Sequence, residues 1–195
     1  MFFNKNKQAH SHLLIHEIIG EKIPDYELDI CLNGKVDKLK LSDYRGKWLI
    51  LFFYPADFTF VCPTELEALA SIHAEAIKLN AEIISISTDT VHTHKVWHEQ
   101  SESVRKVKFP MAADHNGKFS KKLNVYQHDN GMSRRASFIV DPGGMVNAFE
   151  VNSDQYGRNA SELLRKLKAA IHVRENPNEM CPANWHPGDK TIQLK

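Results

Sequence analysis

Alternating apolar and polar residues near the start of the chain predict a β-hairpin. Every second residue from 26 to 32 is apolar, and a second apolar series follows over residues 36–41. The Asn33-Gly34 pair between them is the strongest short-range signal for a two-residue hairpin turn. The same alternation places Cys31 on the more polar face of the hairpin, so we interpret Cys31 as a bystander.

The next part of the chain predicts a buried strand followed by an amphipathic helix. The residues from Trp48 to Tyr54 are continuously apolar, which is typical of a central strand that is buried on both faces. A connecting loop follows over residues 55–61, and a helix begins near Cys62. The positions expected to face the core recur along this helix at three- and four-residue intervals; they are Leu66, Leu69, Ala70, His73, Ala76 and Ile77.

The remaining elements complete an α/β pattern. They are expected over residues 81–87 (strand), 90–103 (helix), 136–141 and 145–151 (hairpin), and from about 161 onward (helix). The order of a hairpin, strand, helix, strand, helix, hairpin and helix predicts a central mixed sheet flanked by helices.

The 195 residues suit one domain with extensions at both ends. Residues 1–12 are expected to form a flexible leader, residues 13–175 the domain, and residues 176–195 a C-terminal tail. The tail contains three prolines and is expected to be irregular. It also carries Cys181 and Trp185, so we expect it to dock somewhere on the domain.

Composition and charge exclude several classes of function. The 25 Lys and Arg residues balance 24 Asp and Glu residues, so the net charge of +1 gives no sign of nucleic-acid binding or of an anionic membrane surface. The longest apolar run is too short to span a bilayer. Three widely spaced cysteines do not form a secreted disulfide framework, and the first residues do not resemble a signal peptide. We therefore expect a cytoplasmic protein.

Cys62 is the strongest candidate for chemistry. It follows a buried strand and lies in the first turn of the next helix, where free N–H groups and the helix dipole favour an anion such as a thiolate. Pro55 fixes the preceding loop, Thr59 can turn its hydroxyl toward the thiolate or a substrate oxygen, and Glu65 can orient an arginine. The alternative interpretation is a buried cysteine that acts as a small hydrophobic residue.

The segment around Cys62 resembles a known family. Residues 53–65 (Phe-Tyr-Pro-Ala-Asp-Phe-Thr-Phe-Val-Cys-Pro-Thr-Glu) are similar to the active-site segment of the peroxiredoxins, Pro-x-x-x-Thr/Ser-x-x-Cys. Four further segments match in order, at residues 87–97, 135–142, 157–159 and 180–185. The resemblance covers about residues 20–190 and is greatest to typical two-cysteine peroxiredoxins of the bacterial alkyl hydroperoxide reductase C type. It implies a thioredoxin-like fold and a peroxidase active in antioxidant defence.

The resemblance also implies roles for the site residues. Cys62 would be the peroxidatic cysteine, whose thiolate attacks a hydroperoxide and becomes a sulfenic acid. Arg135 would supply positive charge near the breaking O–O bond. The remaining members would be Thr59 as a hydrogen-bond partner, Pro55 as a shield against water, and Glu65 and Arg158 as the residues that orient Arg135. In a strand, Arg134 would point away from Arg135, so one of these two arginines should be dispensable.

Cys181 would be the resolving cysteine by the same resemblance. It would attack the Cys62 sulfenic acid of the partner subunit and form an intersubunit disulfide, after local unfolding has brought the sulfurs together. A flavoprotein reductase, thioredoxin or a small thiol partner would then reduce the disulfide. The resemblance further implies a homodimer that assembles into a ring, a decamer of five dimers, and no metal, flavin or haem cofactor.

Three alternatives stand beside this interpretation. His94 and His98, four residues apart on a predicted helix, have a spacing that could chelate a metal, with His92 nearby. An oligomeric holdase chaperone would act independently of Cys62. A thiol–disulfide exchange enzyme would need a second thiol nearby, and the chain has no Cys-x-x-Cys pair. The sequence leaves open the electron donor, the preferred peroxide, the ring size and the role of Cys31.

Overall fold

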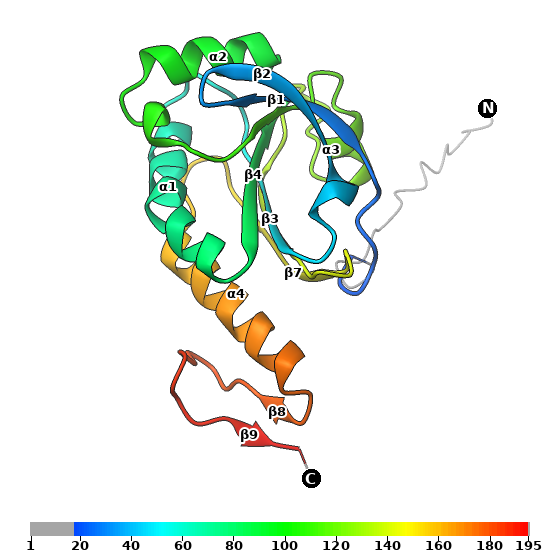
Figure 1. Ribbon diagram of the computed structural model, residues 1–195. Helices are drawn as coiled ribbons and strands as arrows, with labels where there is room; N and C mark the ends of the chain where they lie inside the picture. The colour runs from blue at the N-terminus through cyan, green and yellow to red at the C-terminus, as the bar shows by residue number, and fades with distance from the viewer. Residues whose placement is uncertain (1–17, 195) are drawn as a thin grey trace, which may run out of the picture.

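The computed structural model describes residues 18–194, so the predicted leader over residues 1–12 lies outside the described part of the chain. Seven strands form one mixed sheet (Figure 1) in the order β2-β1-β5-β4-β3-β6-β7. These strands are β1 (Glu27–Leu32), β2 (Lys35–Lys40), β3 (Trp48–Phe53), β4 (Ala81–Ser87), β5 (Met111–Ala113), β6 (Arg135–Val140) and β7 (Val146–Asn152). Strands β3, β4 and β5 run parallel, whereas β6 pairs with β3 and β1 pairs with β5 in the antiparallel sense. The predicted mixed sheet is confirmed.

Helices cover the sheet and fill the connections between its strands. They are α1 (Cys62–Lys78), α2 (Val91–Gln100), α3 (Lys118–Lys122) and α4 (Ala160–Glu175), with short 3-10 turns η2 (Leu41–Tyr44) and η3 (Val104–Lys106). Helices α1 and α4 contact each other on the same side of the sheet, as Figure 1 shows. Thr90 and Asn159 cap α2 and α4 by accepting a backbone N–H with their side chains.

Strand β3 divides the core into two halves. All six of its residues are buried, as the continuous apolar run predicts. Because side chains alternate between the faces of a strand, Ile50 and Phe52 join the core beneath α1 and α4, and Leu51 and Phe53 join the core on the opposite face. This double burial fixes the position of the loop that leaves the end of β3.

The hairpin is confirmed, but the more polar face on which the alternation places Cys31 is not exposed at this residue. Strands β1 and β2 pair from Glu27 with Lys40 to Leu32 with Lys35, around the Asn33-Gly34 turn. Cys31 is only 1% exposed, because α2 packs against its face of β1. The alternation of polar neighbours marked this face as exposed, and only the tertiary packing of a helix buries it.

Three smaller expectations also change. Helix α2 ends at Gln100 rather than near residue 103, where η3 begins a separate turn. On α1, Ile77 is 46% exposed and Ile72 takes its place in the core. Strand β5 and helix α3 were not predicted, because each is too short to show a period and depends on contacts with distant residues.

The C-terminal tail is more ordered than its composition suggests. Figure 1 shows that α4 leads away from the body of the protein to this tail. There β8 (Glu179–Met180) pairs with β9 (Ile192–Gln193) in a two-stranded sheet. Trp185 is 3% exposed, and its ring lies 4.8 Å from the ring of His172 on α4. The tail therefore docks on α4, as its tryptophan led us to expect.

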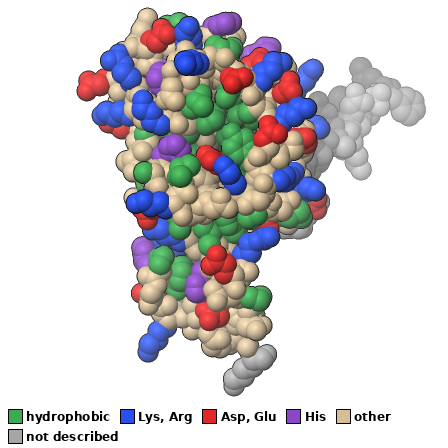
Figure 2. Space-filling view, viewed as in Figure 1, with side chains coloured by type: hydrophobic (Ala, Val, Ile, Leu, Met, Phe, Trp, Pro, Cys, Tyr) green, Lys and Arg blue, Asp and Glu red, His purple; other side chains and the backbone are tan. Residues whose placement is uncertain are grey.

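The surface carries interspersed charges of both signs on the face shown in Figure 2. This distribution agrees with the balanced composition of the whole chain. Over residues 18–194, no helix combines the length and the apolar character that crossing a membrane requires.

Candidate active site

Cys62 lies where the strand-to-helix junction was predicted. It is the first residue of α1 and is fully buried. The N-cap residue, Val61, contributes no capping side chain, and Pro63 occupies the first turn, where its missing N–H does no harm. The positive end of the α1 dipole therefore faces the sulfur.

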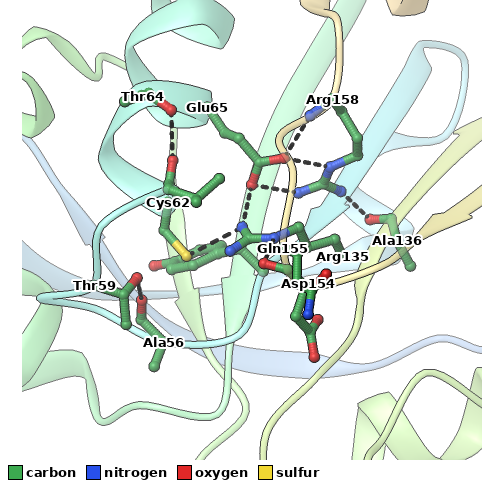
Figure 3. Close-up of polar contacts among 12 residues, drawn as sticks. Ala56, Thr59, Cys62, Thr64, Glu65, Arg135, Ala136, Asp154, Gln155 and Arg158 are labelled. Atoms are coloured by element: carbon green, nitrogen blue, oxygen red, sulfur yellow. Dashed lines mark hydrogen bonds and ion pairs between the residues drawn. The ribbon is translucent and has the colours of Figure 1, made fainter.

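Arg135 is the cationic partner of this sulfur (Figure 3). Its Nη1 lies 3.3 Å from Cys62 Sγ and 2.7 Å from Glu65 Oε2, while its Nε donates to the carbonyl of Asp154 at 3.0 Å. Burial acts to lower the pKa of Arg135, but the contacts with Cys62 and Glu65 outweigh burial and raise it. The guanidinium thus stays charged beside the sulfur, where it can stabilise negative charge on sulfur or on a departing oxygen.

Glu65 joins two buried arginines, and we call Glu65, Arg135 and Arg158 the active-site ion network. Both Glu65 oxygens accept hydrogen bonds from Arg158, whose Nη1 also donates to the carbonyl of Ala136 at 2.8 Å. Burial alone would raise the pKa of Glu65, but the bonds and charge of Arg158, followed by the charge of Arg135, lower it. Glu65 therefore remains a carboxylate that fixes the orientation of both guanidinium groups.

Two packing details support this network. The guanidinium of Arg158 lies 3.3 Å from the centre of the Phe52 ring, on β3. Gly157 precedes Arg158, and a Cβ there would lie 3.2 Å from Cγ of Glu65. Glycine thus allows the chain to approach α1 closely enough for the backbone N–H of Arg158 to donate to Glu65 as well.

The two adjacent arginines point to opposite faces, as predicted. Arg135, in β6, is 3% exposed and faces Cys62, whereas Arg134 is exposed to solvent. Only the side chain of Arg135 therefore reaches the sulfur.

Thr59 and Pro55 lie in the loop between β3 and α1, but Thr59 differs from the expectation. Its hydroxyl donates to the carbonyl of Ala56 at 2.9 Å, and Figure 3 shows this bond turned away from the sulfur. The Ala56 carbonyl is a nearby acceptor for the hydroxyl hydrogen of Thr59. The lone pairs of the Thr59 oxygen remain available to accept a hydrogen bond. Pro55 is buried at the start of the loop.

Cys181 lies in the tail and is not brought together with Cys62. Its Sγ is partly buried, 3.9 Å from the carbonyl of Ala169 on α4. It lines a surface groove with Arg165 and Asn184. Partial burial and the charge of Glu179 raise the pKa of the Cys181 thiol. Cys62 thus faces a cation, whereas the charges of Glu179 and Arg165 act on Cys181 in opposite directions.

A buried polar cluster that was not predicted from the sequence lies beside the loop. The Tyr54 hydroxyl donates to Asp57 Oδ1 at 2.7 Å, and His94 Nδ1 lies 2.7 Å from Asp57 Oδ2. An acidic residue between Ala56 and Phe58, in an otherwise uncharged loop, was the signal that could have found it.

The histidine spacing does not mark a metal site in this structure. His94 and His98 are both buried, and their Nε2 atoms lie 3.1 Å and 3.3 Å from the carbonyls of Ala112 and Val107. Among residues 18–194, no group of three or more His, Cys, Asp or Glu side chains is placed to hold a metal ion. The i, i+4 spacing instead directs both rings into the core.

Comparisons with known proteins match almost the whole described chain. The family model described as "AhpC/TSA family" matches residues 19–149, and the model described as "C-terminal domain of 1-Cys peroxiredoxin" matches residues 170–193, which include Cys181. The alkyl hydroperoxide reductase C of Salmonella typhimurium is 43% identical over 175 residues, covering 90% of this chain and 94% of that protein. The protein of the same name from Bacillus subtilis is 41% identical with the same coverage.

Solved structures agree with these relatives. The crystal structure of Enterococcus faecalis AhpC is 43% identical, with a TM-score of 0.82 over 85% of this chain and 99% of that chain. The reduced Plasmodium vivax 2-Cys peroxiredoxin is 30% identical, with a TM-score of 0.85 over 89% of this chain and 92% of that chain. The predicted thioredoxin-like fold is thereby confirmed. This chain belongs to the AhpC/TSA family, and it is a thiol-dependent peroxidase of the peroxiredoxin type.

Proposed function

We propose that this enzyme reduces hydrogen peroxide and organic hydroperoxides through Cys62, with Cys181 as the resolving cysteine. The observation that carries the proposal is the 3.3 Å contact between Arg135 Nη1 and Cys62 Sγ, which the active-site ion network holds in place. A charged donor fixed beside a sulfur at a helix N-terminus suits an anionic nucleophile.

In the first step, the Cys62 thiolate attacks one oxygen of the hydroperoxide. A bond forms between sulfur and oxygen, the O–O bond breaks, and the second oxygen leaves as water or an alcohol after taking up a proton. Sulfur loses two electrons and becomes a sulfenic acid. Arg135 stabilises the charge that develops on the departing oxygen, while Pro55 limits access of water and Thr59 offers its oxygen to the peroxide.

In the second step, the Cys181 thiol of a partner subunit attacks the Cys62 sulfenic acid. A disulfide forms and one water leaves, so no further oxidant is needed. Cys62 is fully buried, and Cys181 lies on a tail that α4 carries away from the body (Figure 1). Disulfide formation therefore requires the loop over residues 55–61 and the tail to move.

A reductant then completes the cycle by supplying two electrons and two protons to the disulfide. Suitable donors are a flavoprotein disulfide reductase, thioredoxin or a small thiol-bearing protein. We further propose a homodimer that assembles into a ring of five dimers. Three free thiols also suit a reducing compartment, so we place the enzyme in the cytoplasm.

The test is peroxide consumption with cumene hydroperoxide and dithiothreitol, followed by non-reducing electrophoresis. We expect Cys62→Ser to abolish turnover, and we expect either Cys62→Ser or Cys181→Ser to abolish the disulfide-linked dimer of the oxidised wild type. Dithiothreitol can reduce the sulfenic acid directly, so Cys181→Ser should retain turnover in this assay.

Cys31→Ser is the matched control, because Cys31 is a buried thiol outside the site. It should retain both turnover and the dimer band. Turnover that survives in Cys62→Ser would contradict the proposal. Suppression of aggregation that is equal in wild type and Cys62→Ser would indicate the holdase activity as a separate property.

A further inference from the structure

A second buried polar cluster lies next to the loop that carries Cys62 into α1, and its role is unassigned. We call Tyr54, Asp57 and His94 the Asp57 network. The side chains of Asp57 and His94 are both 0% exposed, and Tyr54 is equally buried. Tyr54 directly follows β3, Asp57 lies in the loop and His94 lies in α2, so the network joins the loop to two elements of the body.

The hydrogen bonds of this network require a proton between Asp57 and His94. The carbonyl of Ala112 can only accept, so His94 Nε2, 3.1 Å away, must carry a hydrogen. The opposite nitrogen, Nδ1, lies 2.7 Å from Asp57 Oδ2. An ionised carboxylate also only accepts, so this contact needs one further proton, held either by the imidazole or by the carboxyl group. Without that proton, two lone pairs would face each other in the core.

The surrounding groups act on this proton in both directions, and the pKa of Asp57 is raised on balance. Tyr54 donates its hydroxyl to Asp57 Oδ1, and burial raises the pKa of Tyr54, so it stays a donor. The Asp89 carboxyl, just after β4, accepts from the backbone N–H of Asp57 at 2.8 Å and from the Ser87 hydroxyl at 2.6 Å. Burial raises the pKa of Asp57, and the nearby charge of Asp89 adds to this rise. The bond and charge of His94, followed by the bond from Tyr54, oppose it.

The network is the principal polar anchor of the loop. The loop's other hydrogen-bonding side chain, Thr59, bonds within the loop to Ala56. Phe58 has a left-handed backbone conformation with φ of 55°, which a bulky residue adopts only when its surroundings enforce it. Phe60 is 96% exposed and contributes little packing. The closed loop is therefore strained, and Asp57 holds it against the body.

We propose that Tyr54, Asp57 and His94 are positioning residues that keep the Cys62 loop closed through one shared proton, so that loop opening releases this proton. The proposal rests on the proposed role of Cys62, because loop opening matters only if Cys62 must leave its buried position to meet Cys181. The shared proton then couples pH to the balance between the closed loop, which reacts with peroxide, and the open loop, which forms the disulfide.

The direction of the pH effect follows from proton counting. In the open loop, the Asp57 and His94 side chains separate and meet water, where a carboxyl and an imidazole ordinarily titrate at about pH 3.9 and about pH 6.5. Below about pH 6.5, the open state keeps the proton on His94, so opening does not depend on pH. Above about pH 6.5, the open state loses the proton and the closed state retains it, so opening becomes up to about tenfold more favourable per pH unit.

Asp57→Asn is the decisive variant. An asparagine amide can donate to His94 Nδ1 and accept from the Tyr54 hydroxyl, so the hydrogen bonds persist without the extra proton. Amide hydrogen exchange of residues 56–61 in the reduced full-length protein, corrected for the intrinsic exchange rate, reports loop opening. We expect protection in the wild type to fall by up to about tenfold per unit between pH 7 and 8.5, and protection in Asp57→Asn to stay constant.

Tyr54→Phe is a second variant, which separates how strongly the Asp57 network holds the loop from how its hold depends on the shared proton. It removes one hydrogen bond to Asp57, so protection should fall by about tenfold at every pH while the slope stays. A flat wild-type profile, a slope that survives in Asp57→Asn, or a slope lost in Tyr54→Phe would each overturn the proposal. Strand β3 serves as the internal reference, and its protection should show no such slope in any variant.

The functional readout is the rate of disulfide formation after a single equivalent of peroxide. Cys181 titrates in both the wild type and Asp57→Asn, so the ratio of their rates cancels that contribution. This ratio should rise by up to about tenfold per unit above pH 6.5, and a constant ratio would contradict the proposal. The exchange measurement uses no peroxide, so it can fail while the peroxidase test succeeds, and the reverse also holds.

Discussion

The two proposed redox cysteines lie in regions that differ in burial, electrostatics and anchoring. Cys62 is fully buried at the start of α1, with Arg135 3.3 Å from its sulfur. Cys181 is half-buried on a tail whose own sheet consists of two residue pairs, and the charge of Glu179 helps to raise its pKa. The charge of Arg135 thus acts on one sulfur, whereas burial and the charge of Glu179 raise the pKa of the other thiol.

The surroundings of Cys62 are also held in place more firmly than those of Cys181. Around Cys62, buried groups from α1, β6 and the segment before α4 form the active-site ion network, and the Asp57 network holds the loop. Around Cys181, the tail is held by Trp185 and by a partly exposed His172–Glu179 pair with an Nε2–Oε2 distance of 2.8 Å. The tail should therefore detach more easily than the body around Cys62, which suits a resolving thiol that has to travel.

Loss of Glu65 should produce the largest effect on stability. Glu65→Gln leaves two buried guanidinium groups without their carboxylate, so we expect the free energy of unfolding to fall by about 3–5 kcal/mol. Urea denaturation measures this change. Glu67→Gln is the control on the same helix, because Glu67 pairs with Lys106 at the surface and its loss should leave the midpoint nearly unchanged. Equal losses of unfolding free energy in both variants would contradict the expectation that the buried ion pairs contribute more than the exposed pair.

Glu65→Gln should also change how strongly the stability of the fold depends on acidic pH. Folding lowers the pKa of Glu65, so its carboxylate stabilises the folded state above its ordinary pKa of about 4.3, and this contribution is lost as the pH falls below that value. The wild type should therefore lose more stability than Glu65→Gln between pH 5 and pH 3. Parallel profiles for the two proteins would contradict this assignment.

Loss of Arg135 should have a larger effect on the reaction of Cys62 with peroxide than on the C-terminal tail. Arg135→Met removes the charged donor beside Cys62, so we expect the rate of thiol oxidation to fall by about 10²–10³-fold in stopped-flow measurements. Arg134→Met is the matched control, since the neighbouring side chain points to solvent. It should leave the rate within about twofold, and a large loss in that variant would contradict the orientation of β6.

Removal of the Trp185 ring, which holds the tail on α4, should produce the smallest effect. This effect should be limited to the reactivity of Cys181. Trp185→Ala removes the buried ring that packs on His172, so alkylation of Cys181 should accelerate by about tenfold. Mass spectrometry of the labelled peptides distinguishes the three thiols. Trp185→Phe keeps an aromatic ring there and should change the rate much less. An equal acceleration at Cys62 would show that the two regions open together.

Much of the fold was predictable because its signals are local. The apolar run of β3, the helical period of α1 and the Asn33-Gly34 turn each determine an element from neighbouring residues alone. The placement of Cys62 at the start of a helix follows directly from the first two. Strand β5 and helix α3 escaped prediction, because such short segments carry no period, and β5 is defined by its pairing with β1 and β4.

Prediction of the site divides in the same way between local signals and contacts with distant residues. The sequence by itself determined that Cys62 follows a buried strand, and that Arg134 and Arg135 point to opposite faces. Only the tertiary structure decided that Glu65 meets Arg158, 93 residues away, and that His94 meets Asp57. It also buried Cys31, which its polar neighbours marked as exposed. Local periodicity sets which way a side chain points, whereas the order of strands and the packing of helices set which group it meets.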